Sequence, residues 1–152
     1  LDMNGYTTES FLDKIKNEFD IALSGQKPFR PSRKGEFGFY CSGVWYRLRA
    51  ENVPDDVGPV KSLDVSILQD RILGPVFGIR NPKSDPRIRF VGGIRGLEAL
   101  KKMADSYGGA AFSMYPTSME ELLAVADAGM LMPPKSTWFE PKLRSGLFIH
   151  RF

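Results

Sequence analysis

Near its C-terminus the chain carries a segment whose residue types suit the binding of an anion. Residues 132–147 read M-P-P-K-S-T-W-F-E-P-K-L-R-S-G-L. Consecutive prolines restrict the backbone conformation. Lysine brings a positive point charge to an anion, arginine can donate two parallel hydrogen bonds to it, and serine and threonine hydroxyls can donate further hydrogen bonds. The predicted anion ligands are Lys135, Ser136, Thr137, Lys142 and Arg144. The residues leave open an alternative, a rigid loop that Trp138 and Phe139 anchor in the core.

A glycine-rich turn is the second candidate contact for an anion. Gly92, Gly93 and Arg95 lie between a predicted strand and a predicted helix. Free backbone N–H groups and the helix dipole converge at such a turn, and the arginine adds a fork of donors. The spacing fits neither the dinucleotide fingerprint nor the Walker phosphate loop. A tight turn without a ligand therefore stays open as the alternative.

No group of residues forms a catalytic constellation. Asp64 and Glu140 are candidate acid/base groups, but neither has a paired carboxylate or a neighbouring histidine in the sequence. His150 alternates with apolar neighbours on a predicted strand, and Cys41 has no activating base beside it. One cysteine and one histidine also exclude the usual zinc sites. We predict no catalytic residue, no metal and no cofactor in this chain.

Composition indicates a single domain over residues 1–152. A chain of this length with 42% hydrophobic residues can bury roughly 70% of the surface that it exposes when unfolded. The formal charge of +3 comes from a mixed surface, which does not predict nucleic-acid binding. The sequence holds no membrane-spanning run, no signal segment and no disulfide framework, so we expect a cytoplasmic location. Because the chain begins with Leu1, we expect a fragment of a longer protein.

Hydrophobic periodicity and turn residues predict an alternation of helices and strands. Four helices are expected. The first begins at Thr7 or Thr8 and ends at Ser24-Gly25, and the second begins at Ser62 or Asp64 and ends at Gly74-Pro75. The third covers 97–107, and the fourth begins at Thr117 or Ser118 with a capping box. The expected strands are a hairpin of 36–41 and 44–51, then 87–91, 110–115 and 143–152.

This order predicts an α+β fold. The hairpin brings antiparallel pairing, and the later strand-helix-strand units bring parallel pairing, so we expect a mixed sheet of about five strands. Several strands have one apolar and one polar face, which favours helices mainly on one face of the sheet. The alternative is a three-layer α/β arrangement.

Four motifs resemble one known family. They are S-L-D-V-S-I-L-Q at 62–69, F-V-G-G at 90–93, Y-P-T-S at 115–118, and the whole of 132–147. Over residues 36–152 the chain resembles the C-terminal part of the bacterial and archaeal family known as domain of unknown function 1015. The upstream half of its full-length members resembles the fold shared by chromosome-partitioning proteins, sulfiredoxin and a free-serine kinase. That likeness runs through an Asp-Gly-His-His-Arg run, which this chain does not contain.

The resemblance implies two competing functions. In the first, the full-length protein is a small-molecule kinase, and this chain adds an anion or phosphate-ligand site without being catalytic alone. A nucleotide would then bind only with the full-length protein, and the partners would be the missing N-terminal half of the polypeptide and a small anionic ligand. In the second, the chain is a non-catalytic module for packing or association, which includes a homo-oligomer.

Overall fold

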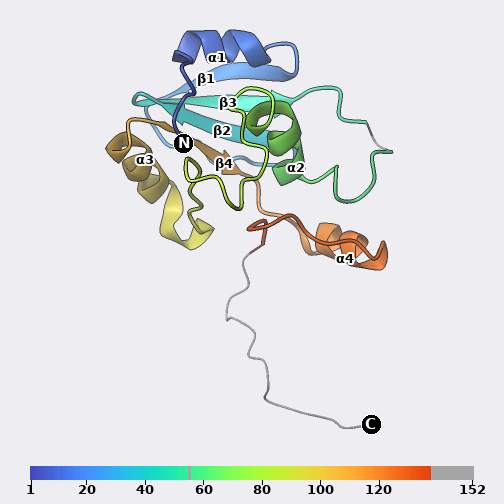
Figure 1. Ribbon diagram of the computed structural model, residues 1–152. Helices are drawn as coiled ribbons and strands as arrows, with labels where there is room; N and C mark the ends of the chain where they lie inside the picture. The colour runs from blue at the N-terminus through green and yellow to red at the C-terminus, as the bar shows by residue number, and fades with distance from the viewer. Residues whose placement is uncertain (55, 138–152) are drawn as a thin grey trace, which may run out of the picture.

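The computed structural model describes residues 1–54 and 56–137 of the chain (Figure 1). Its helices are α1 (Thr8–Ile15), α2 (Asp64–Leu68), α3 (Gly96–Ser106) and α4 (Met119–Asp127). Its strands are β1 (Phe19–Gly25), β2 (Glu36–Cys41), β3 (Val44–Ala50) and β4 (Ala110–Met114). A π-helical turn, η1 (Gln69–Leu73), continues α2, and a 3-10 turn, η2 (Gly93–Arg95), leads into α3.

The four strands form one antiparallel sheet in the order β1-β3-β2-β4. Strands β2 and β3 are the predicted hairpin, closed by the pair Cys41 and Val44. Its two turn residues, Ser42 and Gly43, have φ values of 49° and 86°. Positive φ at both positions is the turn that matches the twist of paired strands. The prediction of this hairpin is confirmed.

Helices cover both faces of the sheet. On one face Phe11 and Ile15 of α1 pack with Phe37, Phe39 and Leu48, and the apolar residues of α2 and η1 join the same cluster. On the other face α3 supplies Ala104 and Leu100, which pack with side chains of β2, β3 and β4. Figure 1 shows α1 and α3 on opposite sides of the sheet. Strand β2, at the centre, is therefore buried at all six positions.

The α+β class is confirmed, and two details differ from the prediction. Among the described residues the sheet has four strands and antiparallel pairing only, where a mixed sheet of about five strands was predicted. The helices are divided between two faces and not mainly on one, so the layering is closer to the three-layer alternative. The predicted strand over 143–152 lies outside the described residues.

The predicted first helix is wrong over its second half. Thr7 caps α1 as predicted, with a capping box to Ser10, but the helix ends at Ile15 and residues 19–25 form β1. Apolar residues at 11, 15 and 19 fit a helical period, whereas Phe19, Ile21 and Leu23 fit the period of a strand equally well. The free edge of β3 decides between them, because pairing along it satisfies the backbone of both strands.

The predicted strand over 87–91 does not form. Asp85 Oδ1 accepts the backbone N–H of Arg87 at 3.0 Å, and the Arg87 guanidinium donates to both carboxylate oxygens of Asp85 and to Phe77 O. These local bonds between side chains and backbone compete with pairing in a sheet. Residues 87–91 therefore form an irregular loop ahead of η2.

The remaining predicted elements are confirmed. Helices occur after Ser62, over 96–106 and after Ser118, and a strand occurs over 110–114. The capping box that starts α4 uses Ser118 and Glu121, one of the two pairs that the sequence offered. A search of the described residues for a helix that is long and apolar enough to cross a membrane finds none.

Candidate functional site

The predicted anion segment begins with a rigid turn. Ser136 Oγ donates a hydrogen bond to Pro133 O at 2.6 Å, and Ser136 N donates to the same oxygen at 3.4 Å. Lys135, between them, has a φ of 62°, in the left-handed region that a residue with a Cβ seldom adopts. The turn presents Lys135 as an exposed side chain, and Thr137 is exposed beside it. We call residues 133–136 the Lys135 turn.

The Lys135 turn lies at the start of α4. Thr117 Oγ1 donates to Ser136 O at 3.3 Å. The next residue, Ser118, caps α4: its Oγ accepts from Glu121 N at 3.2 Å, and Glu121 Oε2 accepts from Ser118 N at 2.9 Å. The turn and the helix start are therefore held together by side chains that the sequence places in adjacent motifs.

Lys34 links this helix start to the sheet. Its Nζ lies 2.7 Å from Glu121 Oε1, in an ion pair whose alignment is not that of a directional hydrogen bond. The Lys34 side chain is 46% exposed and that of Glu121 is 19% exposed. Lys34 lies two residues before the start of β2 and pairs with Glu121 near the start of α4, so it brings a second cation to the neighbourhood of the Lys135 turn.

Asp64 is the buried carboxyl group of the same neighbourhood. Only 9% of the residue is exposed, and its Oδ1 accepts from Gly35 N at 2.8 Å. Burial is the largest cause that raises the pKa of Asp64, the Gly35 N–H and Lys34 lower it, the negative charge of Glu121 raises it, and the net result is a pKa of about 6. Asp64 thus exchanges its proton close to neutral pH, which suits the acid/base role considered from the sequence.

Glu36 fixes the loop before β2, residues 27–35, which holds two prolines and four basic residues including Lys34 and which we call the basic loop. Its carboxylate accepts from Ser32 N at 3.0 Å, from Ser32 Oγ at 2.9 Å and from Arg33 Nε at 3.1 Å. Burial opposes its ionisation, but these donors outweigh burial and lower the pKa of Glu36. The loop before β2 is therefore anchored by a buried charge and is not simply a solvated connector.

The structure does not join the two predicted anion contacts. Gly92 precedes η2, Gly93 and Arg95 belong to it, and Gly93 and Arg95 are exposed at the start of α3. Within residues 1–54 and 56–137, no hydrogen bond or ion pair connects them with the Lys135 turn. Several other residues singled out in the sequence lie outside the described residues: Trp138, Phe139, Glu140, Lys142, Arg144 and His150.

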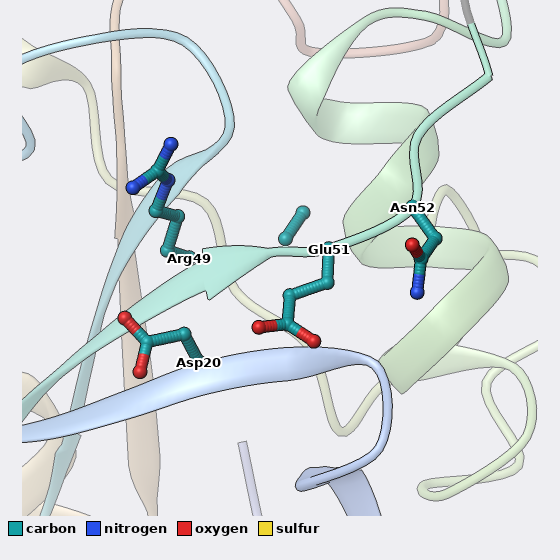
Figure 2. Close-up of a pocket in the computed structure, with 5 residues that line it drawn as sticks. Asp20, Arg49, Glu51 and Asn52 are labelled. Carbon is teal, nitrogen blue, oxygen red and sulfur yellow. The ribbon is translucent and has the colours of Figure 1, made fainter.

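A surface pocket of about 520 Å³ lies at the C-terminal end of β3, where β3 pairs with β1, and no residue in it was predicted. Figure 2 shows Asp20 on β1 and Arg49 on β3, with Glu51 and Asn52 just after β3. Arg71 donates to Glu51 O at 2.5 Å and to Asn52 O at 3.1 Å. Because carboxylates and an arginine line the pocket together, it selects neither an anion nor a cation. The described residues hold no group of three potential metal ligands.

Sequence reasoning named Asp64 but missed its neighbours. Glu121 was predicted as a capping residue, and the same carboxylate also pairs with Lys34. Lys34 and Asp64 are 30 positions apart, so no local pattern relates them. The proline-punctuated basic loop was the available signal, and only the fold shows which of its cations faces α4.

One comparison with known proteins gives a match. The model of the family described as "Protein of unknown function (DUF1015)" matches residues 1–66, while no curated protein and no solved structure matches the chain. The matched residues include α1 and the basic loop and end within the S-L-D-V-S-I-L-Q motif, whereas the resemblance was recognised over residues 36–152. The match supports the resemblance to this family and places it on the N-terminal part of this chain, over residues 1–66.

Proposed function

We propose that this chain is the anion-binding companion of a phosphoryl-transfer protein. It supplies a site for a phosphate-bearing ligand and is not catalytic by itself. The ligand groups are Lys135 and Thr137 of the described residues, with Lys142 and Arg144 from the following segment. Ser136, also predicted as a ligand, donates its hydroxyl hydrogen to Pro133 O and so fixes the turn. The catalytic half is the upstream part of the same polypeptide, and the single cysteine favours a cytoplasmic location.

The observation that carries the proposal is the fixed geometry of the Lys135 turn. Its backbone is held by Ser136 Oγ at Pro133 O and by Thr117 at Ser136 O. A cation on a rigid turn loses less conformational freedom on binding than one on a loose loop, so more of the electrostatic attraction appears as affinity. The left-handed backbone at Lys135, with a φ of 62°, is part of this turn, as it is at Ser42 in the hairpin.

Lys34 and Asp64 extend the site beyond the predicted residues. Lys34 is held at the start of α4 by Glu121, next to the residues that contact the Lys135 turn. An incoming phosphate would compete with the Glu121 carboxylate for the Lys34 ammonium group. Asp64 has a pKa of about 6, on which the charges of Lys34 and Glu121 act. A bound phosphate that changed this ion pair would therefore also change the protonation of Asp64.

A thermal-shift screen tests the proposal on the isolated chain. The ligands are phosphate, phosphoserine, ADP and ATP, each at matched ionic strength. A ligand at ten times its dissociation constant adds about 1.4 kcal/mol to the free energy of unfolding, which raises Tm by roughly 3 °C or more in a chain of this size. Lys135→Ala removes the shift. The matched control is Lys83→Ala, since Pro82-Lys83-Ser84 repeats the tripeptide Pro134-Lys135-Ser136 on another exposed loop.

The outcomes separate the two functions that the sequence left open. A shift that Lys83→Ala keeps and Lys135→Ala loses supports the anion site. A shift that both variants lose equally reflects net charge and counts against it. Without a shift for any ligand, the packing or association module is the better account. An assay of the full-length protein for phosphorylation of free serine tests the larger claim about the catalytic half.

A further inference from the structure

Helix α4 and the residues after it expose a concentration of large apolar side chains. Met119 and Leu123 are 57% and 53% exposed, and Met130 and Leu131 are 51% and 88% exposed. Met119 and Leu123 are four residues apart and share one side of the helix. Val125 is the one buried residue of α4. We call Met119, Leu123, Met130 and Leu131 the α4 apolar surface.

The surface continues into an apolar pocket. Met130 N donates to Val125 O at 3.0 Å, which keeps Met130 and Leu131 against the end of the helix. There they line a pocket of about 430 Å³ together with Val57, Gly58, Val60 and Lys61. Single exposed apolar residues are ordinary, but a group that borders an apolar pocket indicates a surface that something covers.

We propose that residues 138–152 of this same chain cover the α4 apolar surface. The described residues end at Thr137, directly after Ser136, whose carbonyl accepts the hydrogen bond from Thr117 at the start of α4. The segment therefore begins beside the helix. Extended, it reaches up to roughly 50 Å, whereas α4 is roughly 14 Å long. Every part of the surface lies within its reach.

The composition of the segment complements the surface in apolar character. Nearly half of its residues are large and apolar, which is more than a solvated tail carries. They are Trp138, Phe139, Leu143, Leu147, Phe148, Ile149 and Phe152. Trp138 and Phe139 come first, directly after Thr137, where the described chain ends.

The two parts are also complementary in charge. Helix α4 carries the carboxylates Glu120, Glu121 and Asp127 and no lysine or arginine. Residues 138–152 carry three cations against the single acid Glu140. The cations are Lys142, Arg144 and Arg151. Opposite charges favour the correct pairing of surfaces and disfavour wrong partners. Apolar content, charge and tether point to the same occupant.

The experiment measures oxidation of methionines by hydrogen peroxide in the full chain, read by mass spectrometry. Met119 and Met130 report on the surface, and the half-buried Met103 of α3 is the internal reference. Wild-type protein is compared with Trp138→Ser/Phe139→Ser/Phe148→Ser. The control Phe90→Ser/Ile94→Ser removes two exposed apolar side chains elsewhere. We expect Met119 and Met130 to oxidise at least fivefold faster in the triple variant, with Met103 and the control unchanged.

Three results would overturn the proposal. Equal rates in the wild type and the triple variant would show that the segment covers nothing. Protection that grows with protein concentration, together with a dimer mass by light scattering, would assign the surface to a second copy. The third result would be that Met119 oxidises as fast in the folded wild-type protein as in urea-unfolded protein. This measurement needs no variant, so it tests the proposal even if the triple variant does not fold.

Discussion

Strand β2 and helix α4 differ in how completely their neighbours cover them. All six residues of β2 are buried, because α1 and α2 pack on one side and α3 on the other. In α4 only Val125 is buried, although the helix also carries Met119, Leu122 and Leu123. In Figure 1 α4 lies apart from the sheet. Helices of the described residues cover both faces of the sheet. The position of α4, in contrast, is held by contacts at its first residues and by whatever covers its exposed apolar side.

The largest effect is expected in the sheet. Phe39→Ala should lower the free energy of unfolding by about 3–5 kcal/mol, because Phe39 is fully buried among Phe11, Tyr46 and Phe112 and the change leaves a cavity. Urea denaturation followed by circular dichroism measures it. Leu123→Ala in α4 is the comparison variant and should cost less. Equal costs would mean that α4 is covered as fully as β2.

The second effect concerns pH. Burial raises the pKa of Asp64 from 3.8 to about 6, so between these values the folded state binds more protons than the unfolded state. The free energy of unfolding then falls as pH rises through this window, by at most about 3 kcal/mol before screening by water is considered. Asp64→Asn, which can still accept from Gly35 N, should lose this fall.

Denaturation midpoints measured from pH 4 to pH 7 test the role of Asp64. The difference between wild type and Asp64→Asn isolates it, because Glu36, whose pKa is lowered, acts with the opposite sign in both proteins. Asp70→Asn, which changes an exposed carboxylate of η1, is the matched control. If Asp64→Asn kept the wild-type profile, the charge cluster next to α4 would not contain a buried titrating group.

The third effect tests how tightly the face of the sheet beneath the basic loop is packed. A Cβ at Gly38 would overlap Ser113 Oγ and press against Phe29, which accepts the hydrogen bond from Ser113 at 3.0 Å. Gly38→Ala should therefore cost about 1–3 kcal/mol through overpacking. Gly93→Ala is the control, since nothing lies within 4 Å of a Cβ there. Equal midpoints for both variants in urea would show that the face is loosely packed.

The smallest effect is the ion pair at the start of α4. A double-mutant cycle of Lys34→Ala and Glu121→Gln should give a coupling of about 0.2–1 kcal/mol, because the lysine is nearly half exposed. The coupling should weaken in 0.5 M salt. A coupling above about 2 kcal/mol would mean that this pair, and not the outer cover of α4, holds the helix in place.

Local signals in the sequence predicted the parts of the fold that depend on near neighbours. Thr7 and Ser118 were among the predicted helix caps because their partners are three residues away. The hairpin was predicted because Ser42-Gly43 separates two strand-like runs, and both turn residues have positive φ in the structure. Residues 19–25 were predicted wrongly because their spacing fits two periods, and only the edge of β3 selects the strand. The predicted strand at 87–91 failed because Arg87 bonds to Asp85 instead.

By itself the sequence determined the α+β class, the helix caps and the hairpin, since these depend on residue types and on spacings of a few positions. The tertiary structure decided the rest. It divided the helices between two faces of the sheet, and it brought Lys34 and Asp64 to the start of α4 from distant positions. The physical reason is that burial and charge pairing depend on which segments meet in space. Local sequence patterns do not show which distant segments come into contact.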